Sequence, residues 1–191
     1  IGTEKGIAKE YGNVFGGGQG SSTALTAGVV GGNVSLEVQG GTLSGSVYGG
    51  GRIASVGTYF AMATDPRYGK MQDGDDHGVI AINLTGGTIN QNVFGGCMGT
   101  IEDAALGVSK NVTVKLNENG TASTKGCIVK GDIFGCNNVN SSPQGDVTVH
   151  IYATQNANTT QMGNTAASGN TAAVNGKTKG TYDVHAVYGG G

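Results

Sequence analysis

Four segments of the chain alternate strictly between apolar and polar residues. They read NVSLEVQ from Asn33, VIAINLT from Val79, NVTVKLN from Asn111 and DVTVHIY from Asp146. In each segment every second position holds valine, isoleucine or leucine. Alternation with a period of two predicts a β-strand with one buried face. Since no window of the chain has a convincing helical period, the sequence predicts an all-β fold.

A second, shorter pattern occurs five times and consists of a β-branched residue, an aromatic residue and glycines. It reads GNVFGGG at 12–18, GSVYGGG at 45–51, QNVFGGC at 91–97, GDIFGCN at 131–137 and AVYGGG at 186–191. Two whole units, VSLEVQGGTLSGSVYGGG and IAINLTGGTINQNVFGGC, agree almost letter for letter. The pattern therefore indicates an internal repeat, with insertions at about 57–78 and 153–180.

One unit of this kind cannot bury its own apolar face, whereas several stacked units form a continuous core. The sequence thus predicts a single domain over 1–191, a parallel β-helix or β-solenoid of about four to five coils with strands ~4.8 Å apart. The handedness rule for parallel connections predicts a right-handed coil. We expect one corner at Gly40–Gly41 and Gly86–Gly87, and another at the glycines after each aromatic residue.

The aromatic residue of each unit occupies the same position, so the rings are expected to form a stacked ladder. Three readings remain open: the rings pack in the core or at a corner, they form an outward stripe for sugar rings, or they contact a neighbouring molecule. Offset stacking contributes about 0.5–1.5 kcal/mol per pair. The ladder consists of Phe15, Tyr48, Phe94, Phe134 and Tyr188.

The insertion at 57–78 collects polar and aromatic residues, and loops on rigid scaffolds often have functional roles. Its candidates for ligand or surface contact are Tyr59, Phe60, Arg67, Tyr68 and His77. Three carboxylates are weak candidates for calcium, which takes about six to eight oxygen ligands; they are Asp73, Asp75 and Asp76. The plain alternative is a solvated loop. The insertion at 153–180 is a polar, low-complexity segment with room for a short extra strand pair.

Composition and charge narrow the classes of function. The 191 residues include 38 glycines and have a formal net charge of −2, without a basic stripe, so no nucleic acid partner is expected. No apolar run reaches about 18 residues, so no membrane span is expected. The glycines lack the helix or the Lys and Ser/Thr that nucleotide loops require, and we expect no cofactor.

No catalytic set is visible, because the three histidines are isolated and the aligned row Ser46, Asn92 and Asp132 has one carboxylate. Cys97 and Cys136 lie one position apart in the aligned units. This offset favours buried thiols over a disulfide between them, and Cys127 is expected as a small strand residue. No group of cysteines and histidines has zinc-ligand spacing.

Units of the form GGT(L/I)xGxV(F/Y)GGG resemble those of large glycine-rich surface proteins of Bacteroidetes and related gut bacteria, which are classed as β-helical and adhesin-like. The resemblance implies export and an extracellular or cell-surface location. We therefore expect a structural or adhesive module that presents loops to glycans or to host or cell-surface proteins. The alternatives are a fibre building block that stacks end to end, and a carbohydrate-active lyase or hydrolase. Because the chain starts at Ile1 and ends within a unit, we expect a piece of a longer repeat protein.

Overall fold

The computed structural model describes residues 12–118, 126–152, 173–174, 177–178 and 184–190. In this part of the chain all regular structure is β, which confirms the expected class. No helix in the described ranges is long and apolar enough to cross a membrane. The strands are β1 (Val14–Phe15), β2 (Val34–Leu43), β3 (Val47–Tyr48), β4 (Ile80–Ile89), β5 (Val93–Phe94), β6 (Val112–Leu116), β7 (Ile128–Val129), β8 (Ile133–Phe134), β9 (Val147–Ile151), β10 (Ala173–Val174), β11 (Lys177–Thr178) and β12 (Val187–Tyr188).

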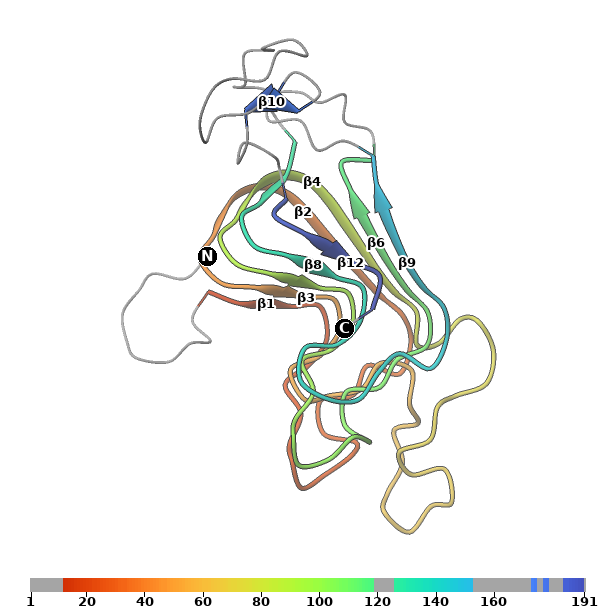
Figure 1. Ribbon diagram of the computed structural model, residues 1–191. Helices are drawn as coiled ribbons and strands as arrows, with labels where there is room; N and C mark the ends of the chain where they lie inside the picture. Colours follow the sequence, from red (N-terminus) through yellow and green to blue (C-terminus); the bar gives the residue numbers. More distant parts are fainter. Residues whose placement is uncertain (1–11, 119–125, 153–172, 175–176, 179–183, 191) are drawn as a thin grey trace.

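Two sheets of parallel strands make up the body of the molecule (Figure 1). One has the order β1-β3-β5-β8-β12, and the other has the order β2-β4-β6-β9 with β7 also beside β4. The chain visits the two sheets alternately, with β6 and β7 both joining the second sheet beside β4, and neither sheet closes on itself. We call β2 with β3, β4 with β5, β6 with β7 and β8, and β9 with β12 the four layers, because each pairs with the next.

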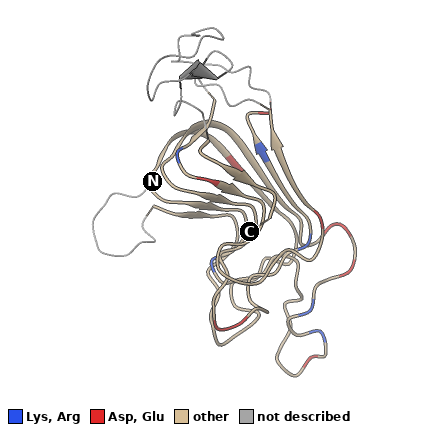
Figure 2. Ribbon diagram, viewed as in Figure 1, with Lys and Arg blue, Asp and Glu red and all other residues tan. Residues whose placement is uncertain are grey.

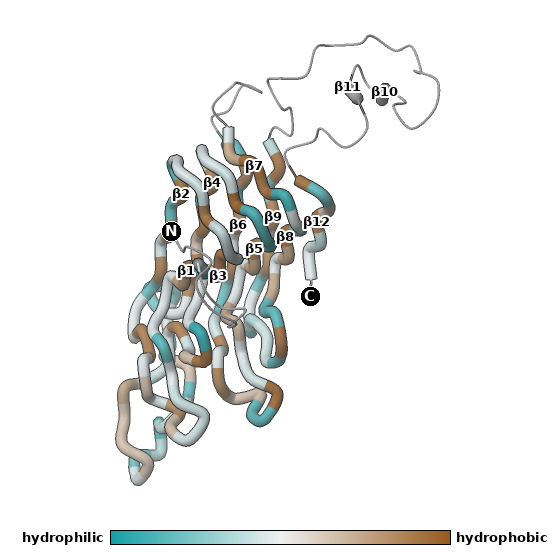
Figure 3. Tube along the Cα trace, turned by 90° about the vertical axis from the view of Figure 1, so that its left-hand side faces the viewer, coloured by the Kyte–Doolittle hydropathy of each residue, from teal (hydrophilic) through white to brown (hydrophobic). Residues whose placement is uncertain are grey.

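The strands that alternation predicted are β2, β4, β6 and β9, and they pair in register through their apolar positions. Their inward side chains form three rows, so that brown positions of neighbouring strands lie beside one another in Figure 3. In the middle layers these side chains are at most 1% exposed. Complete burial of such a side chain contributes about 1.5–3 kcal/mol, so the rows are the main source of stability. The rows are Val34-Ile80-Val112-Val147, Leu36-Ile82-Val114-Val149 and Val38-Leu84-Leu116-Ile151.

The glycine that follows each aromatic residue lies where two layers approach closely. A Cβ on Gly49 would lie 2.2 Å from the carbonyl oxygen of Gly95, and one on Gly95 would lie 2.3 Å from that of Gly135. No side chain fits such a gap, so glycine is required here by contact between backbones. The repeated glycine of the sequence pattern is thus a packing requirement of the stack.

The expected corner at Gly40–Gly41 and Gly86–Gly87 is wrong, because β2 and β4 continue through these glycines. The second glycine of each pair has a positive φ, 80° at Gly41 and 86° at Gly87, and the register shifts between Val38 and Thr42. Glycine adopts this conformation without steric cost, so the segment is an irregularity within one strand.

The cysteines form no bridge between Cys97 and Cys136, since Cys97 has a free thiol and is fully buried. Burial raises the pKa of the Cys97 thiol to about 12. Cys127 is also buried, and its amide donates a 2.7 Å hydrogen bond to Oδ1 of Asn117 just before β7. Most of the second insertion, 153–180, lies outside the described residues, apart from the antiparallel pair β10–β11.

Candidate functional site

The first insertion, 57–78, is an ordered hairpin between β3 and β4, which we call the hairpin loop. Thr58 and Met71 form an antiparallel bridge. The Tyr59 amide donates to the carbonyl oxygen of Lys70 at 2.9 Å, and the Gln72 amide donates to that of Gly57 at 2.8 Å. These bonds define the base of the hairpin, from which its outer half projects below the sheets in Figure 1.

The outer half of the hairpin loop is closed by an ion pair between Asp65 and Arg67. The Arg67 side chain donates to both carboxylate oxygens of Asp65, at 3.0 and 2.8 Å. These hydrogen bonds lower the pKa of Asp65 to about 2. The guanidinium carbon of Arg67 lies 5.1 Å from the centre of the Tyr59 ring, a cation–π contact. The predicted contact residues Tyr59 and Arg67 therefore shape the loop itself.

Side chains of the hairpin loop also attach it to the segment that precedes β2. The Tyr68 hydroxyl accepts a 3.0 Å hydrogen bond from the Leu25 amide. The His77 Nδ1 lies 3.0 Å from the carbonyl oxygen of Gly31, and Gln72 Nε2 donates to the same oxygen at 2.5 Å. Two predicted contact residues, Tyr68 and His77, thus have structural hydrogen bonds within the protein.

The first segment of the hairpin loop beyond its base, Phe60–Ala61–Met62, which we call the tip, has two of the most exposed large apolar side chains among the described residues. Phe60 is 84% exposed and Met62 is 78% exposed. The loop that bears them is fixed by the bonds above, so the two side chains are presented from a defined backbone. Large apolar side chains held together at a surface are typical of binding sites.

The acidic residues of the hairpin loop do not converge on one point. Asp73, Asp75 and Asp76 are exposed. Across the described residues no three His, Cys, Asp or Glu side chains are placed to hold a metal ion. Oδ1 of Asp76 lies 3.4 Å from Nε2 of His77. The geometry gives the calcium prediction no support.

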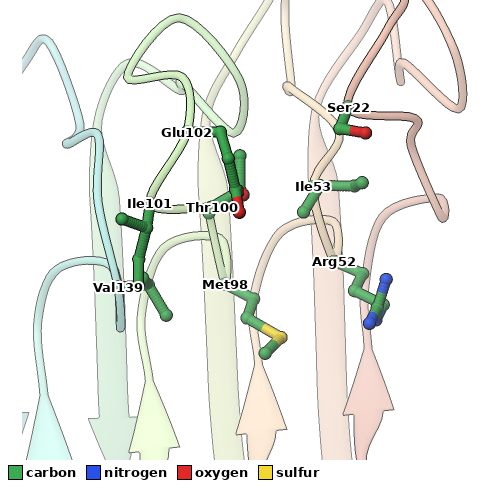
Figure 4. Close-up of a pocket in the computed structure, with 9 residues that line it drawn as sticks. Ser22, Arg52, Ile53, Met98, Thr100, Ile101, Glu102 and Val139 are labelled. Carbon is green, nitrogen blue, oxygen red and sulfur yellow. The ribbon is translucent and has the colours of Figure 1, made fainter.

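A groove of ≈ 450 Å³ crosses three layers on the loop side of the molecule (Figure 4). Its apolar lining comes from Ile53 after β3, Met98 and Ile101 after β5, and Val139 after β8. Backbone hydrogen bonds connect these segments, including one from the Val139 amide to the carbonyl oxygen of Met98 at 3.0 Å. Ile101 is 80% exposed. The polar lining consists of Ser22, Arg52, Thr100 and Glu102.

The five aromatic rings stack as predicted. Successive ring centres are 4.7–5.1 Å apart, with planes inclined by 8–11°. The rings lie on the strand side opposite the core valines, but Tyr48 and Phe94 are only 4% and 6% exposed. Asn138 Nδ2 also donates to the Tyr48 hydroxyl at 3.2 Å. Because neighbouring rings cover each other's faces, the middle of the ladder offers no flat surface to a sugar ring.

No family model, no curated protein and no solved structure matches the chain. Among the described residues, exposed large apolar side chains gather at the hairpin loop, at the groove and along β9 and β12 of the last layer.

Two charged clusters lie away from the hairpin loop and the groove. His185 Nδ1 lies 2.6 Å from Oδ1 of Asp132, the one carboxylate in the aligned row of Ser46, Asn92 and Asp132. Lys115 Nζ donates to Glu118 at 2.6 Å, and this hydrogen bond lowers the pKa of Glu118. These pairs are partly exposed to solvent, which screens them. Figure 2 shows charges scattered over loops and strand faces.

Proposed function

We propose that this protein is a structural and adhesive module that acts outside the cell or on a bacterial cell surface. In this proposal the two sheets are the sides of a right-handed parallel β-solenoid, and the hairpin loop is the part presented for contact with a glycan or a surface protein. The location follows from the resemblance of the glycine-rich units to those of adhesin-like surface proteins.

The solenoid assignment is supported by the path of the chain. Each visit to a sheet adds a parallel strand beside the previous one, with like residues in register. A stack of this kind is rigid along its axis, because each layer is bonded to its neighbours over both sheets. Rigid scaffolds of this type suit the presentation of loops.

The single observation that supports presentation is the contrast within the hairpin loop. Its base and sides make hydrogen bonds to Leu25 and Gly31, whereas Phe60 is 84% exposed. A loop ordered before binding loses less conformational entropy on contact, so a small apolar tip suffices for useful affinity.

The test is to replace the tip with polar residues, Phe60→Ser with Met62→Gln, and to measure binding to a glycan array and to intact bacterial and epithelial cells. The exposed positions make the fold insensitive to the change, so the thermal unfolding midpoint should stay within about 2 °C. Binding should fall at least about 10-fold, as expected for loss of a binding hot spot.

The matched control is Tyr152→Gln, which removes a side chain that is 47% exposed and lies outside the hairpin loop. It should bind like the parent. Unchanged binding by the tip variant, or equal loss in both variants, contradicts a presenting role for the loop.

A further inference from the structure

The two ends of the stack of layers differ in how well their apolar side chains are covered. Figure 3 shows β1 and β2 at one end of the stack and β12 at the other. On the first edge strand, β2, Val34 and Val38 are only 7% exposed. On the last strands, Ile151 of β9 is 38% exposed and Val187 of β12 is 39% exposed. The apolar rows of the core are thus left open at the edges of β9 and β12, which we call the open end.

The open end also presents backbone groups that bond the next strand in every inner layer. The amide of the glycine after each ring donates to the following layer, as from Gly135 to the carbonyl oxygen of Tyr188 at 2.9 Å. The corresponding amide of the last layer belongs to Gly189, and among the described residues no strand follows β12 or β9 in either sheet. Backbone groups at such an edge are a template for pairing with another strand.

The glycine at the open end has no structural reason within the described part of the chain. A Cβ on Gly95 would lie 2.3 Å from the carbonyl oxygen of Gly135, and one on Gly135 would lie 2.5 Å from that of Gly189. A Cβ on Gly189 has nothing within 4 Å. Glycine loses more conformational freedom on folding than any other residue, so it is unfavourable where no contact requires it. A further layer that packs against Gly189 would require it.

The ladder of rings ends at the same place with one face uncovered. Tyr188 stacks on Phe134 alone among the described residues, at 5.0 Å, and is 49% exposed. A ring face at the end of such a ladder accommodates one more stacked ring. The open end therefore combines apolar side chains, backbone donors, an unfilled space beside a glycine and a ring face. These are the features that each inner layer offers to the layer after it.

We propose that the open end binds one further unit of the same repeat from another polypeptide, by addition of parallel strands beside β9 and β12. The occupant follows from continuity with the contacts between layers, which join units of this sequence pattern in register. The added unit supplies alternating apolar residues to the core rows and an aromatic ring to Tyr188. The hairpin loop takes no part, so this proposal and the proposed function can fail independently.

A peptide with the sequence of residues 33–51, NVSLEVQGGTLSGSVYGGG, tests the proposal as a probe. Fluorescence anisotropy of the labelled peptide, titrated with the whole chain, should show saturable binding. Leu36→Asp in the peptide places a carboxylate in the middle core row and should weaken binding at least about 10-fold. Ser35→Asp is the matched control, because this exposed position points away from the core, and it should bind like the parent peptide.

A pair of glycine variants tests which end of the stack binds the peptide. Gly189→Ala in the protein should weaken binding at least about 10-fold, because the new Cβ meets the backbone of the added unit. Gly49→Ala in the peptide should bind normally, since its Cβ points away from the stack. Addition at the first end predicts the reverse, because the ladder would direct the Cβ of the peptide toward Gly16. Gly32→Ala, also open and next to β2, is the protein control and should bind like the parent.

Each remaining outcome decides against the proposal. Absence of saturable binding, equal binding of the Leu36→Asp peptide, or binding that is unaffected by Gly189→Ala overturns it. Sedimentation velocity of the parent alone adds one outcome. If the parent self-associates through Gly189 and takes up no peptide, a second copy covers the open end and the proposal is wrong. The tip variant, Phe60→Ser with Met62→Gln, should take up the peptide like the parent, whatever its binding to glycans or cells.

Discussion

Strands β6 and β9 have nearly the same sequence, VTVKL and VTVHI, but very different burial. In β6 the inward residues Val112, Val114 and Leu116 are 0% exposed, whereas in β9 Ile151 is 38% exposed. The difference lies in their neighbours: β6 lies between β4 and β9, and within the described residues β9 pairs with β6 alone. The inward face of β9 is thus less buried than that of β6 because one neighbouring strand is missing, whereas β2, at the other edge of the same sheet, keeps Val34 and Val38 only 7% exposed.

The pattern of aromatic residues and glycines shows the same contrast. Phe94, between two rings, is 6% exposed, and Tyr188, with one ring neighbour, is 49% exposed. A Cβ on Gly135 would lie 2.5 Å from the carbonyl oxygen of Gly189, whereas a Cβ on Gly189 has nothing within 4 Å. Equivalent positions in the middle and last layers therefore make matched pairs for mutation.

The largest difference is expected for a charge placed in equivalent core positions. Val114 and Val149 are register partners in β6 and β9. Val114→Asp places a carboxylate in a dry interior and should lower the free energy of unfolding by about 4 kcal/mol or more, while Val149→Asp should cost about 1–2 kcal/mol. Urea unfolding at low protein concentration measures both. Equal losses would show that the last layer is as closed as the middle ones.

The next largest effect concerns the glycine ladder. Gly95→Ala should lower the free energy of unfolding by about 3 kcal/mol, because the new Cβ meets the backbone of the next layer. Gly189→Ala is its control and should change stability by no more than about 0.5 kcal/mol, since the site is open. Thermal unfolding of both variants compares them directly. A tolerated alanine at Gly95 would refute the close approach of the layers.

A smaller effect is expected in the ring ladder. Phe94→Leu removes two ring contacts and should cost about 2 kcal/mol, whereas Tyr188→Leu removes one and should cost about 1 kcal/mol. Denaturant titrations give the two losses in the free energy of unfolding when its dependence on denaturant concentration has the same slope in all variants. The ranking is the prediction, and a larger loss at Tyr188 would contradict it.

The last effect is absent at neutral pH and is a dependence on alkaline pH that originates at Cys97. The pKa of this thiol rises from 9.0 to about 12 on folding, so the unfolded chain loses the proton first. Stability should be constant below pH 9 and fall between pH 9 and 12, by at most about 1.4 kcal/mol per pH unit. Cys97→Ala should remove this part of the pH dependence, while Cys136→Ala, at a half-buried site, should leave it.

Alternation of apolar residues predicted β2, β4, β6 and β9, because one face of each strand is buried. The alignment of aromatic residues predicted the ring ladder, since equivalent positions lie beside one another in successive layers. The irregularity at Gly41 was missed, because a glycine pair reads equally as a turn or as a distortion within a strand. The strands and the ring ladder could be predicted because both follow from patterns that repeat along the sequence.

The candidate site was predicted less well, because its contacts join residues far apart in sequence. Tyr68 was a candidate for ligand contact, but its hydroxyl accepts a hydrogen bond from Leu25, 43 positions earlier. The groove was not predicted, although the sequence contained one sign of it. Arg52 and Met98, which both line the groove, each stand four positions after a ladder ring and so occupy equivalent positions in successive units. The contact of Asp132 with His185 likewise spans 53 positions.

The central claim is that adjacent layers are parallel and in register, and a cross-linking measurement tests it most directly. Thr113 and Thr148 are register partners on the outer face of β6 and β9. Their Cα atoms should be about 5 Å apart, within the disulfide range, so Thr113→Cys with Thr148→Cys should form a bridge under mild oxidation. Thr113→Cys with His150→Cys, displaced by two residues, should not. A bridge in the displaced pair, or none in the paired positions, would contradict the in-register stack.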